Sequence, residues 1–497
     1  MSFLSILSIL QIPSFLSIPS QILSILSILL KCRLSSYQEE TTMILPKIKA
    51  GFIGFGEVNS PRELIERKVE AARRALEERD IELVTTAPVC DDPRGENEAR
   101  ARRELARQSF DLLVICVAGW IPSHSVISVI DGFAHKPMAL WGLTGHMEGD
   151  RLVTTADQAG ASALRDPMDA LGYRFKYIYD SPDTPPTGAD RVQRFGEVAR
   201  AAALLRQSRV GMMGYRDMNL YGTLVDGVSL RRVVGPEVEV FDTLEIVQRM
   251  EQVDGGDVAG LLAELRREWT FEQPVADSAL EKGIRMYLAL MDKVAERTYQ
   301  AISLVDVFGV KKLLNFPPAL VLLLLADRGG VASIPENDGL GAVTQLIVRY
   351  LTGQVGAYLE FYEFFSDRLL MGAPDYVPSE VVEGPVRVLP WPGFGGLKDG
   401  ILNVSRVKTG RVTLCRLASR GDRYRMHIAA GRAVTPRPWE EAGWQPPAPQ
   451  LPGLEVILDT PVEEFAQQVL GQHYILAHGD QRPALTDLCE LLGIEVI

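Results

Sequence analysis

The chain has 497 residues and a mass of 54.9 kDa, which at roughly 100–200 residues per domain predicts about three domains. Hydrophobic residues make up 46% of it and charged residues 23%, a composition that excludes a disordered chain. Because 64 acidic residues outnumber 52 basic ones, the net charge is −12, and we expect neither nucleic acid nor a membrane as a partner. The five cysteines form no C-x-x-C pair, which predicts reduced thiols in a cytoplasmic protein.

Residues 1–42 differ in kind from the rest of the chain. Serine recurs through residues 1–30 and no basic residue precedes Lys31, so the charged start of a signal peptide is missing. A translation start at Met43, a disordered hydrophobic extension and a signal anchor are the alternatives; Pro13 and Pro19 argue against the anchor. The first two predict that deleting residues 1–42 leaves activity intact.

Residues 43–207 alternate short apolar strands with amphipathic helices. The strand KAGFIGF is followed by the helix PRELIERKVEAARRALEERD, and the apolar runs IELVTTAPV, DLLVICVAGW and HKPMALWGLTG continue the pattern. This alternation predicts a doubly wound parallel sheet, with ligands at the carboxyl ends of its strands. Trp120 ends one such strand and is a candidate for that rim, although a core aromatic is an equal alternative.

The pattern restarts at residue 208 and changes again after residue 374. Residues 208–374 begin with SRVGMMGYRDMNLYG and continue through helices expected at 278–298, 317–327 and 340–352, which predicts a second α/β domain. Residues 375–497 consist of short β-rich segments broken by Gly and Pro. The predicted fold is therefore α/β, with two doubly wound parallel-sheet domains followed by a C-terminal β-rich, barrel-like domain.

Two glycine-rich motifs do not support nucleotide binding. In GFIGFGE, Asn59 stands where the last glycine of G-x-G-x-x-G would be, so a tight strand-to-helix turn explains the glycines. GFGGLKDG lacks the order of a phosphate-binding loop and lies in β-rich sequence.

The most informative stretch is ASIPENDGLGAVTQLIVRYLTGQVGAYLEFYEFF. Glu336, Asn337 and Asp338 follow a turn and precede an apolar helix, where helix capping is the preferred interpretation for Asp338. Glu360 lies in an aromatic run, where a carboxylate requires a partner or a metal, and a structural ion pair is the alternative to a functional role.

His473 opens the apolar strand of LGQHYILAHGD. Such a histidine is weak evidence alone, since most are structural. Together, Glu336, Glu360 and His473 form an open set of oxygen and nitrogen ligands suited to Mn²⁺ or another divalent cation.

Five segments in this order resemble the L-fucose/L-arabinose isomerase superfamily. They are PENDGLGAVTQL, LTGQVGAYLEFY, GFGGLKDG, GDRYRMHIA and GQHYILAHGD. The resemblance covers residues 208–497 and, more weakly, the N-terminal sheet domain. It departs from the arabinose type where Ala373 and Pro374 stand in place of a histidine, and where Gln472-His473 replaces paired histidines.

The resemblance implies that Glu336 and Glu360 are catalytic and bind the metal, that His473 completes the metal ligands, and that the substrate is a small-molecule sugar. It further implies substrate contacts from Trp120, Asn337 and Gln472, and a homo-oligomer, either a trimer or a hexamer. The expected reaction is aldose–ketose isomerisation of an open-chain sugar through an enediol.

Two alternatives stay open at this point. One is a non-catalytic sugar-binding or sensing protein on the same fold. The other concerns the substrate, which could be a 6-deoxy or 6-sulfo sugar; Arg216 could meet an anionic group, but an ordinary surface charge is the preferred interpretation of this residue.

Overall fold

A computed structural model describes residues 45–57, 59–373, 376–391, 397, 399–441 and 451–497. The N-terminal extension 1–42, Pro374 and most of GFGGLKDG (393–400) lie outside the described residues.

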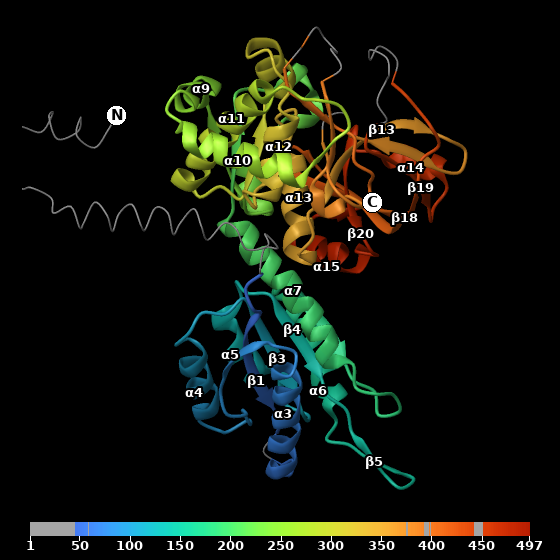
Figure 1. The fold of residues 1–497 in the computed structure, drawn as a ribbon. Coiled ribbons are helices and arrows are strands. Elements are labelled where there is room, and N and C mark those ends of the chain that lie inside the picture. Colours follow the sequence, from blue (N-terminus) through green and yellow to red (C-terminus); the bar gives the residue numbers. More distant parts are fainter. Residues whose placement is uncertain (1–44, 58, 374–375, 392–396, 398, 442–450) are drawn as a thin grey trace, which may run out of the picture. The chain divides into compact units, whose positions relative to one another are not determined.

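The N-terminal sheet is parallel and has the strand order β2-β1-β3-β4-β7. Its strands β1, β3 and β4 are labelled in Figure 1. Its strands are Lys49–Phe55 (β1), Glu82–Thr85 (β2), Leu112–Val117 (β3), Met138–Gly142 (β4) and Phe175–Tyr179 (β7). Its helices are Arg62–Glu77 (α3), Glu96–Leu105 (α4), Ser123–Ile130 (α5), Asp157–Ala170 (α6) and Gly188–Gln207 (α7). A two-stranded hairpin, His146–Glu148 (β5) with Arg151–Val153 (β6), follows β4.

Helices cover both faces of this sheet, as the sequence predicts. Alternate residues of β1 and β3 pack on α3 and α7 on one face and on α4, α5 and α6 on the other. The glycines of GFIGFGE serve packing: a Cβ at Gly54 would lie 2.4 Å from a methyl of Val69 on α3. The glycines of this motif thus pack closely against α3, which agrees with the predicted tight turn between β1 and this helix.

A second parallel sheet has the order β12-β11-β8-β9. Its strands are Arg209–Met213 (β8), Glu237–Phe241 (β9), Ala301–Leu304 (β11) and Ala332–Ile334 (β12). The helices of this region are Gly227–Val233 (α8), Thr243–Met250 (α9), Gly255–Glu268 (α10), Asp277–Arg297 (α11), Ala319–Asp327 (α12) and Gly339–Thr352 (α13). One face of the sheet packs on α8 and α13, and the other on α9 to α12.

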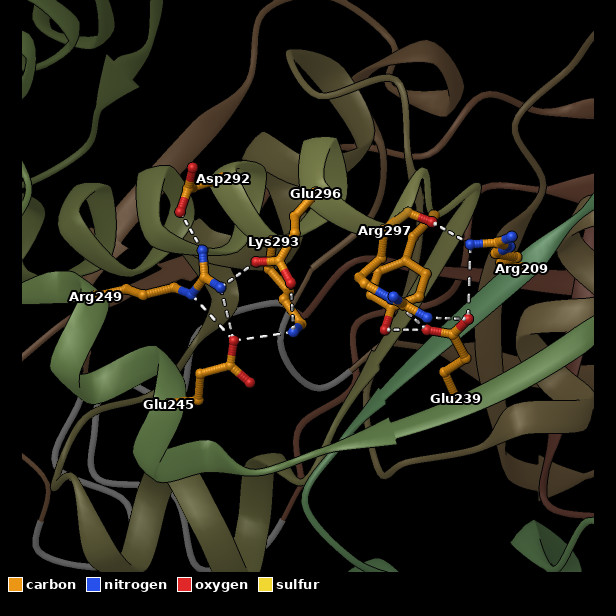
Figure 2. A network of polar contacts seen from close by, with 9 residues as sticks. Arg209, Glu239, Glu245, Arg249, Asp292, Lys293, Glu296 and Arg297 are labelled. Atoms are coloured by element: carbon orange, nitrogen blue, oxygen red, sulfur yellow. Dashed lines mark hydrogen bonds and ion pairs between the residues drawn. The ribbon is translucent and has the colours of Figure 1, made fainter. Parts of the chain in front are cut away.

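A network of charged side chains fastens α9 to α11 (Figure 2). Arg249 and Lys293 share the carboxylate of Glu245, at 2.7 and 2.9 Å. Arg249 also reaches Asp292 and Glu296 on α11. Beside it, Arg297 forms a two-pronged ion pair with Glu239 of β9 at 2.8 and 2.9 Å. The network stabilises the helical layer on the side of the sheet away from α13.

Six antiparallel strands close into a barrel towards the C-terminus. They run in the order β17-β20-β13-β14-β19-β18, and β18 pairs back with β17. They are Ala357–Phe364 (β13), Leu369–Gly372 (β14), Gly410–Arg420 (β17), Arg423–Val434 (β18), Gly453–Leu458 (β19) and His473–His478 (β20). The barrel-like architecture is confirmed, and two of its strands, β13 and β14, precede residue 375.

The remaining elements of this region flank the barrel. They are the helices Val462–Gln468 (α14) and Arg482–Leu492 (α15), the terminal strand Glu495–Val496 (β21), and a three-stranded sheet of Thr270–Phe271 (β10), Arg387–Pro390 (β15) and Ile401–Asn403 (β16).

The α/β class with two parallel sheets agrees with the sequence prediction. Met43–Ile497 forms one compact unit, and the domain boundaries predicted at residues 207 and 374 stay predictions. The helix α7 links the regions: it packs on the first sheet, on α13 and on α15. In the part of the chain that is described, no helix is long and apolar enough to cross a membrane.

Candidate functional site

The candidate site lies at the carboxyl end of the second parallel sheet. Strand β8 is flanked by β9 on one side and by β11 on the other. The chain therefore passes from β8 to β9 on one side and then crosses over to β11 on the opposite side of β8. Open α/β sheets bind ligands at such a switch point, beyond the carboxyl ends of the strands. Asp217, Asp306 and Glu336 follow β8, β11 and β12 and meet there.

Glu336 and Asn337 adopt a left-handed turn between β12 and α13. Their φ angles are 62° and 52°, an unfavourable conformation for residues with a Cβ, and one that is found at functional sites. Hydrogen bonds hold the turn: Glu336 N–H donates to Asp306 Oδ1 (2.7 Å), Asn337 N–H to Leu304 O (2.8 Å), and Asn337 Nδ2 to Tyr215 O (2.7 Å) and Met213 O (3.1 Å). The surroundings thus enforce the direction of the Glu336 side chain.

Glu360 and His473 are direct neighbours on adjacent strands. Glu360 of β13 pairs with His473 of β20, and side chains at opposed positions project from the same face. Leu359 and Tyr474, the adjacent residues, belong to the barrel interior, so Glu360 and His473 project outward. On this outer side α13, which follows Glu336, packs against β17 and β20.

His473 joins the two glutamates. Its Nδ1 lies 3.6 Å from Glu336 Oε2, and its Nε2 lies 3.6 Å from Glu360 Oε2. The ring stacks on Tyr358, with centroids 4.3 Å apart and planes 18° apart. The side chain is buried, and Nε2 makes no hydrogen bond with the described residues. The three residues that the sequence predicts as metal ligands are therefore brought together.

Burial and like charges govern the protonation of these groups. Desolvation, together with Asp306, Glu360 and Asp338, raises the pKa of Glu336 to about 9, and Lys311 opposes this rise. Burial lowers the pKa of His473 to about 3, so its imidazole is neutral at pH 7. A neutral imidazole whose ring nitrogen has a free lone pair is the form that can bind a metal ion.

Asp338 does more than the predicted helix capping. Its Oδ1 accepts the N–H of Gly341 at 2.9 Å, which confirms the cap. In addition, Arg416 of β17 donates to both carboxylate oxygens, and the Tyr358 hydroxyl donates to Oδ2 at 2.9 Å. Because Tyr358 also stacks on His473, Asp338 and Arg416 fix the platform on which the histidine rests.

Sequence reasoning missed Asp217, Asp306, Lys311 and Arg416. Asp306 follows the buried strand AISL and is 1% exposed, and its Oδ2 lies 3.1 Å from Lys311 Nζ. Asp217 accepts the N–H groups of Val307 and Phe308 at 2.7 and 2.8 Å. Burial and the neighbouring Asp306 raise the pKa of Asp217 to about 6. An aspartate directly after an apolar strand is the signal that could have identified Asp306.

The three residues predicted to contact the substrate, Gln472, Asn337 and Trp120, lie in different environments. Gln472 lies at the site, with Nε2 3.3 Å from Glu336 Oε2. Asn337 is fully buried; its Nδ2 donates to the carbonyls of Met213 and Tyr215, and its Oδ1 makes no hydrogen bond within the described part of the chain. Trp120 follows β3 in the N-terminal sheet, is 39% exposed, and makes backbone hydrogen bonds with Glu57 and Thr155.

The chemical nature of the donors suits a divalent cation, but their present arrangement does not converge on one point. Two carboxylates and a neutral imidazole with an unbonded nitrogen are suitable ligands, and the buried excess of negative charge favours a cation. However, His473 faces the two glutamates through different nitrogens. Among the described residues, no group of three or more His, Cys, Asp or Glu is arranged to hold a metal ion.

Comparison with curated proteins identifies sugar isomerases as relatives. The chain is 24% identical to the L-arabinose isomerase of Shouchella clausii over 309 residues, which are 59% of this chain and 60% of that protein. It is 28% identical to the L-fucose isomerase of Bacteroides thetaiotaomicron over 118 residues (24% of this chain, 20% of the relative). The L-fucose isomerase of Haemophilus influenzae is 25% identical over 123 residues, 25% of this chain and 21% of the relative.

These matches are partial. The chain spans 60% of the length of the arabinose isomerase and about a fifth of the fucose isomerases. No protein-family model matches the chain. The homologues, which are named both for fucose and for arabinose, support a place for this chain in the superfamily of fucose/arabinose isomerase-like sugar isomerases.

Proposed function

We propose that the chain is an aldose–ketose isomerase of the fucose/arabinose isomerase type, acting on an open-chain sugar. The observation that carries the proposal is the position of His473, 3.6 Å from both Glu336 and Glu360, in a buried site at the carboxyl end of a parallel sheet. The names of the relatives support the same reaction class.

The two glutamates would perform the proton transfer. One carboxylate removes the proton from C2 of the aldose while O1 receives a proton, which gives the enediol. A proton then returns to C1 and the O2 hydroxyl loses its proton, which gives the ketose. The carboxyl group that has taken up a proton in one step acts as the general acid of the next.

Glu336, Glu360 and His473 are proposed to hold Mn²⁺ or another divalent cation. When bound, such an ion would polarise O1 and O2 and stabilise the charge that develops on them. His473 contributes a neutral donor, so it adds no charge to a site that already contains several carboxylates.

A 6-deoxy or 6-sulfo sugar is the finer proposal for the substrate. Arg216 lies on the loop after β8, with its guanidinium 5.2 Å from the ring centroid of Tyr221, and Asp217 beside it reaches the site. Trp120, Asn337 and Gln472 are proposed to contact the sugar, in a homo-oligomer of three or six subunits. Light scattering of the purified protein tests the subunit number.

The reaction is tested by exchange of the C2 proton in D₂O. The purified protein is freed of metal with a chelator, reloaded with Mn²⁺, and given a panel of aldoses that includes 6-deoxy and 6-sulfo sugars. We expect metal-dependent exchange for at least one of them. Binding of a sugar without exchange would instead favour a sensing protein.

Glu336→Gln and Glu360→Gln are expected to lower turnover about 10²–10⁴-fold, because each removes a proton-transferring group without changing side-chain size. Glu363→Gln, an exposed glutamate on the same strand as Glu360, is the matched control and should retain full activity. Wild-type turnover in either test variant would contradict the assignment.

A further inference from the structure

The carboxylate that supports the Glu336 turn is itself held by a lysine on a rare helix type. Residues Asp306–Lys311 form a π-helix (η4), in which Val310 N–H donates to Val305 O at 3.0 Å. A hydrogen bond between residues five apart places the first and last side chains of η4 side by side. This explains how Lys311 Nζ comes within 3.1 Å of Asp306 Oδ2. Such π-helical turns are rare in proteins, and those that occur often lie at functional sites.

The two carboxylate oxygens of Asp306 have different partners. Oδ2 faces Lys311, whereas Oδ1 accepts the backbone N–H of Glu336 at 2.7 Å. Asp306 is 1% exposed, and the side chain of Lys311 is 15% exposed, so little water competes for these contacts. A rotation of the Asp306 carboxylate would therefore break the hydrogen bond to Glu336.

A second aspartate fixes the π-helix from the other side. Asp217, fully buried, accepts the N–H groups of Val307 and Phe308 at the start of η4. The first turn of η4 is thus held by Asp217, and its last residue, Lys311, pairs with Asp306. This closed set of contacts links β8, β11 and the Glu336 turn.

We propose that Lys311 is a positioning residue of the isomerase site, acting through Asp306 to hold Glu336 in its left-handed conformation. The proposal rests on the proposed function for its catalytic part. Its structural part concerns one hydrogen bond, from Glu336 N–H to Asp306 Oδ1, and can be tested without measuring turnover.

Lys311→Met tests this role, because it keeps the length of the side chain and removes the ammonium group. Since misplacement of a catalytic group by about 1 Å can cost 10²-fold in rate, we expect kcat to fall about 10²-fold while KM changes less than about threefold. Lys312→Met is the matched control. Lys312 is the next residue and is exposed, and its ammonium group lies over the ring of Phe308. It should leave kcat and the melting temperature unchanged.

A double-mutant comparison tests whether Lys311 acts through Asp306. Asp306→Asn should lower kcat by a similar factor, and the double variant should be no more than about threefold slower than Asp306→Asn, since the two residues act as one unit. Independent, multiplying effects would overturn the proposal. So would a kcat for Lys311→Met within threefold of wild type.

Hydrogen exchange separates a failure of this proposal from a failure of the proposed function. Amide exchange of a peptide covering residues 334–340 should be at least about tenfold faster in Lys311→Met than in wild type and in Lys312→Met. If the wild-type protein isomerises no sugar, the proposed function fails, and the exchange rates still decide whether Lys311 holds the turn. Unchanged exchange would overturn the positioning role even in an active enzyme.

Discussion

At the scale of single residues, the site depends on a buried ion pair that no local pattern indicates. Asp338 is one residue from the strained turn and occupies the N-cap of α13, which the sequence predicts. Its pairing with Arg416 of β17 requires the barrel to pack against α13. Arg416 lowers the pKa of Asp338 despite full burial, so Asp338 is a carboxylate at neutral pH.

Removal of Arg416 is expected to leave Asp338 as an uncompensated buried charge. We predict that Arg416→Met lowers the free energy of unfolding by about 3–5 kcal/mol, the usual cost of breaking a buried pair. Arg420→Met, at an exposed position of the same strand, should change it by less than about 0.5 kcal/mol. Urea denaturation measures both; a loss below 1 kcal/mol for Arg416→Met would show that the pair contributes little.

His427 inside the barrel predicts a dependence of stability on pH. Its Nδ1 lies 2.7 Å from the Tyr474 hydroxyl, and burial lowers its pKa from 6.5 to about 4. Between these values the unfolded chain binds a proton that the folded chain does not. The contribution of His427 is therefore complete above pH 6.5 and is lost as the pH falls towards 4, by up to about 1.4 kcal/mol per pH unit.

His427→Gln cannot titrate, so its free energy of unfolding should fall less steeply than that of wild type between pH 6.5 and 4. Denaturation curves at several pH values measure the two slopes. Parallel slopes would mean that His427 has the same pKa in the folded barrel as in the unfolded chain.

At the scale of elements, closure of the barrel places Glu360 beside His473. Both belong to strands whose alternating pattern is local, but their register depends on the pairing of β13 with β20. The close contact of β18 with β19 is part of the same closure, and it depends on Gly431, where a Cβ would lie 2.4 Å from the carbonyl oxygen of Ile457. A backbone atom cannot move aside as a side chain can.

Gly431→Ala is therefore predicted to lower the melting temperature and to separate β18 from β19. Gly260→Ala is the control, because Gly260 lies within α10 with open space around its Cβ position. This second change should stabilise the protein by about 0.5–1 kcal/mol through helix propensity. Thermal unfolding compares the two variants, and equal effects would contradict the steric argument.

At the scale of the whole molecule, Met43–Ile497 forms one compact unit. This unit contains every residue of the candidate site, and it is compact by itself. Lys176 of β7 pairs with Asp487 of α15 at 2.7 Å, so the first sheet is tied directly to the C-terminal region.

A chain that starts at Met43 is expected to keep the melting temperature and the C2-proton exchange of the full chain. Both are measured on the two proteins side by side. A loss of either property would show that residues 1–42 contribute to folding or to the site.

The sequence by itself determined the α/β alternation, the β-rich C-terminal region and three of the residues that meet at the site. These depend on periodicity, on turn residues and on motif order, which are local properties of the chain. Only the tertiary structure decided that Asp306, Lys311, Asp338 and Arg416 support Glu336 and His473. Their contacts join β11, α13 and β17, and the pairing of elements so distant in sequence is governed by strand register and long-range packing, which leave no local pattern.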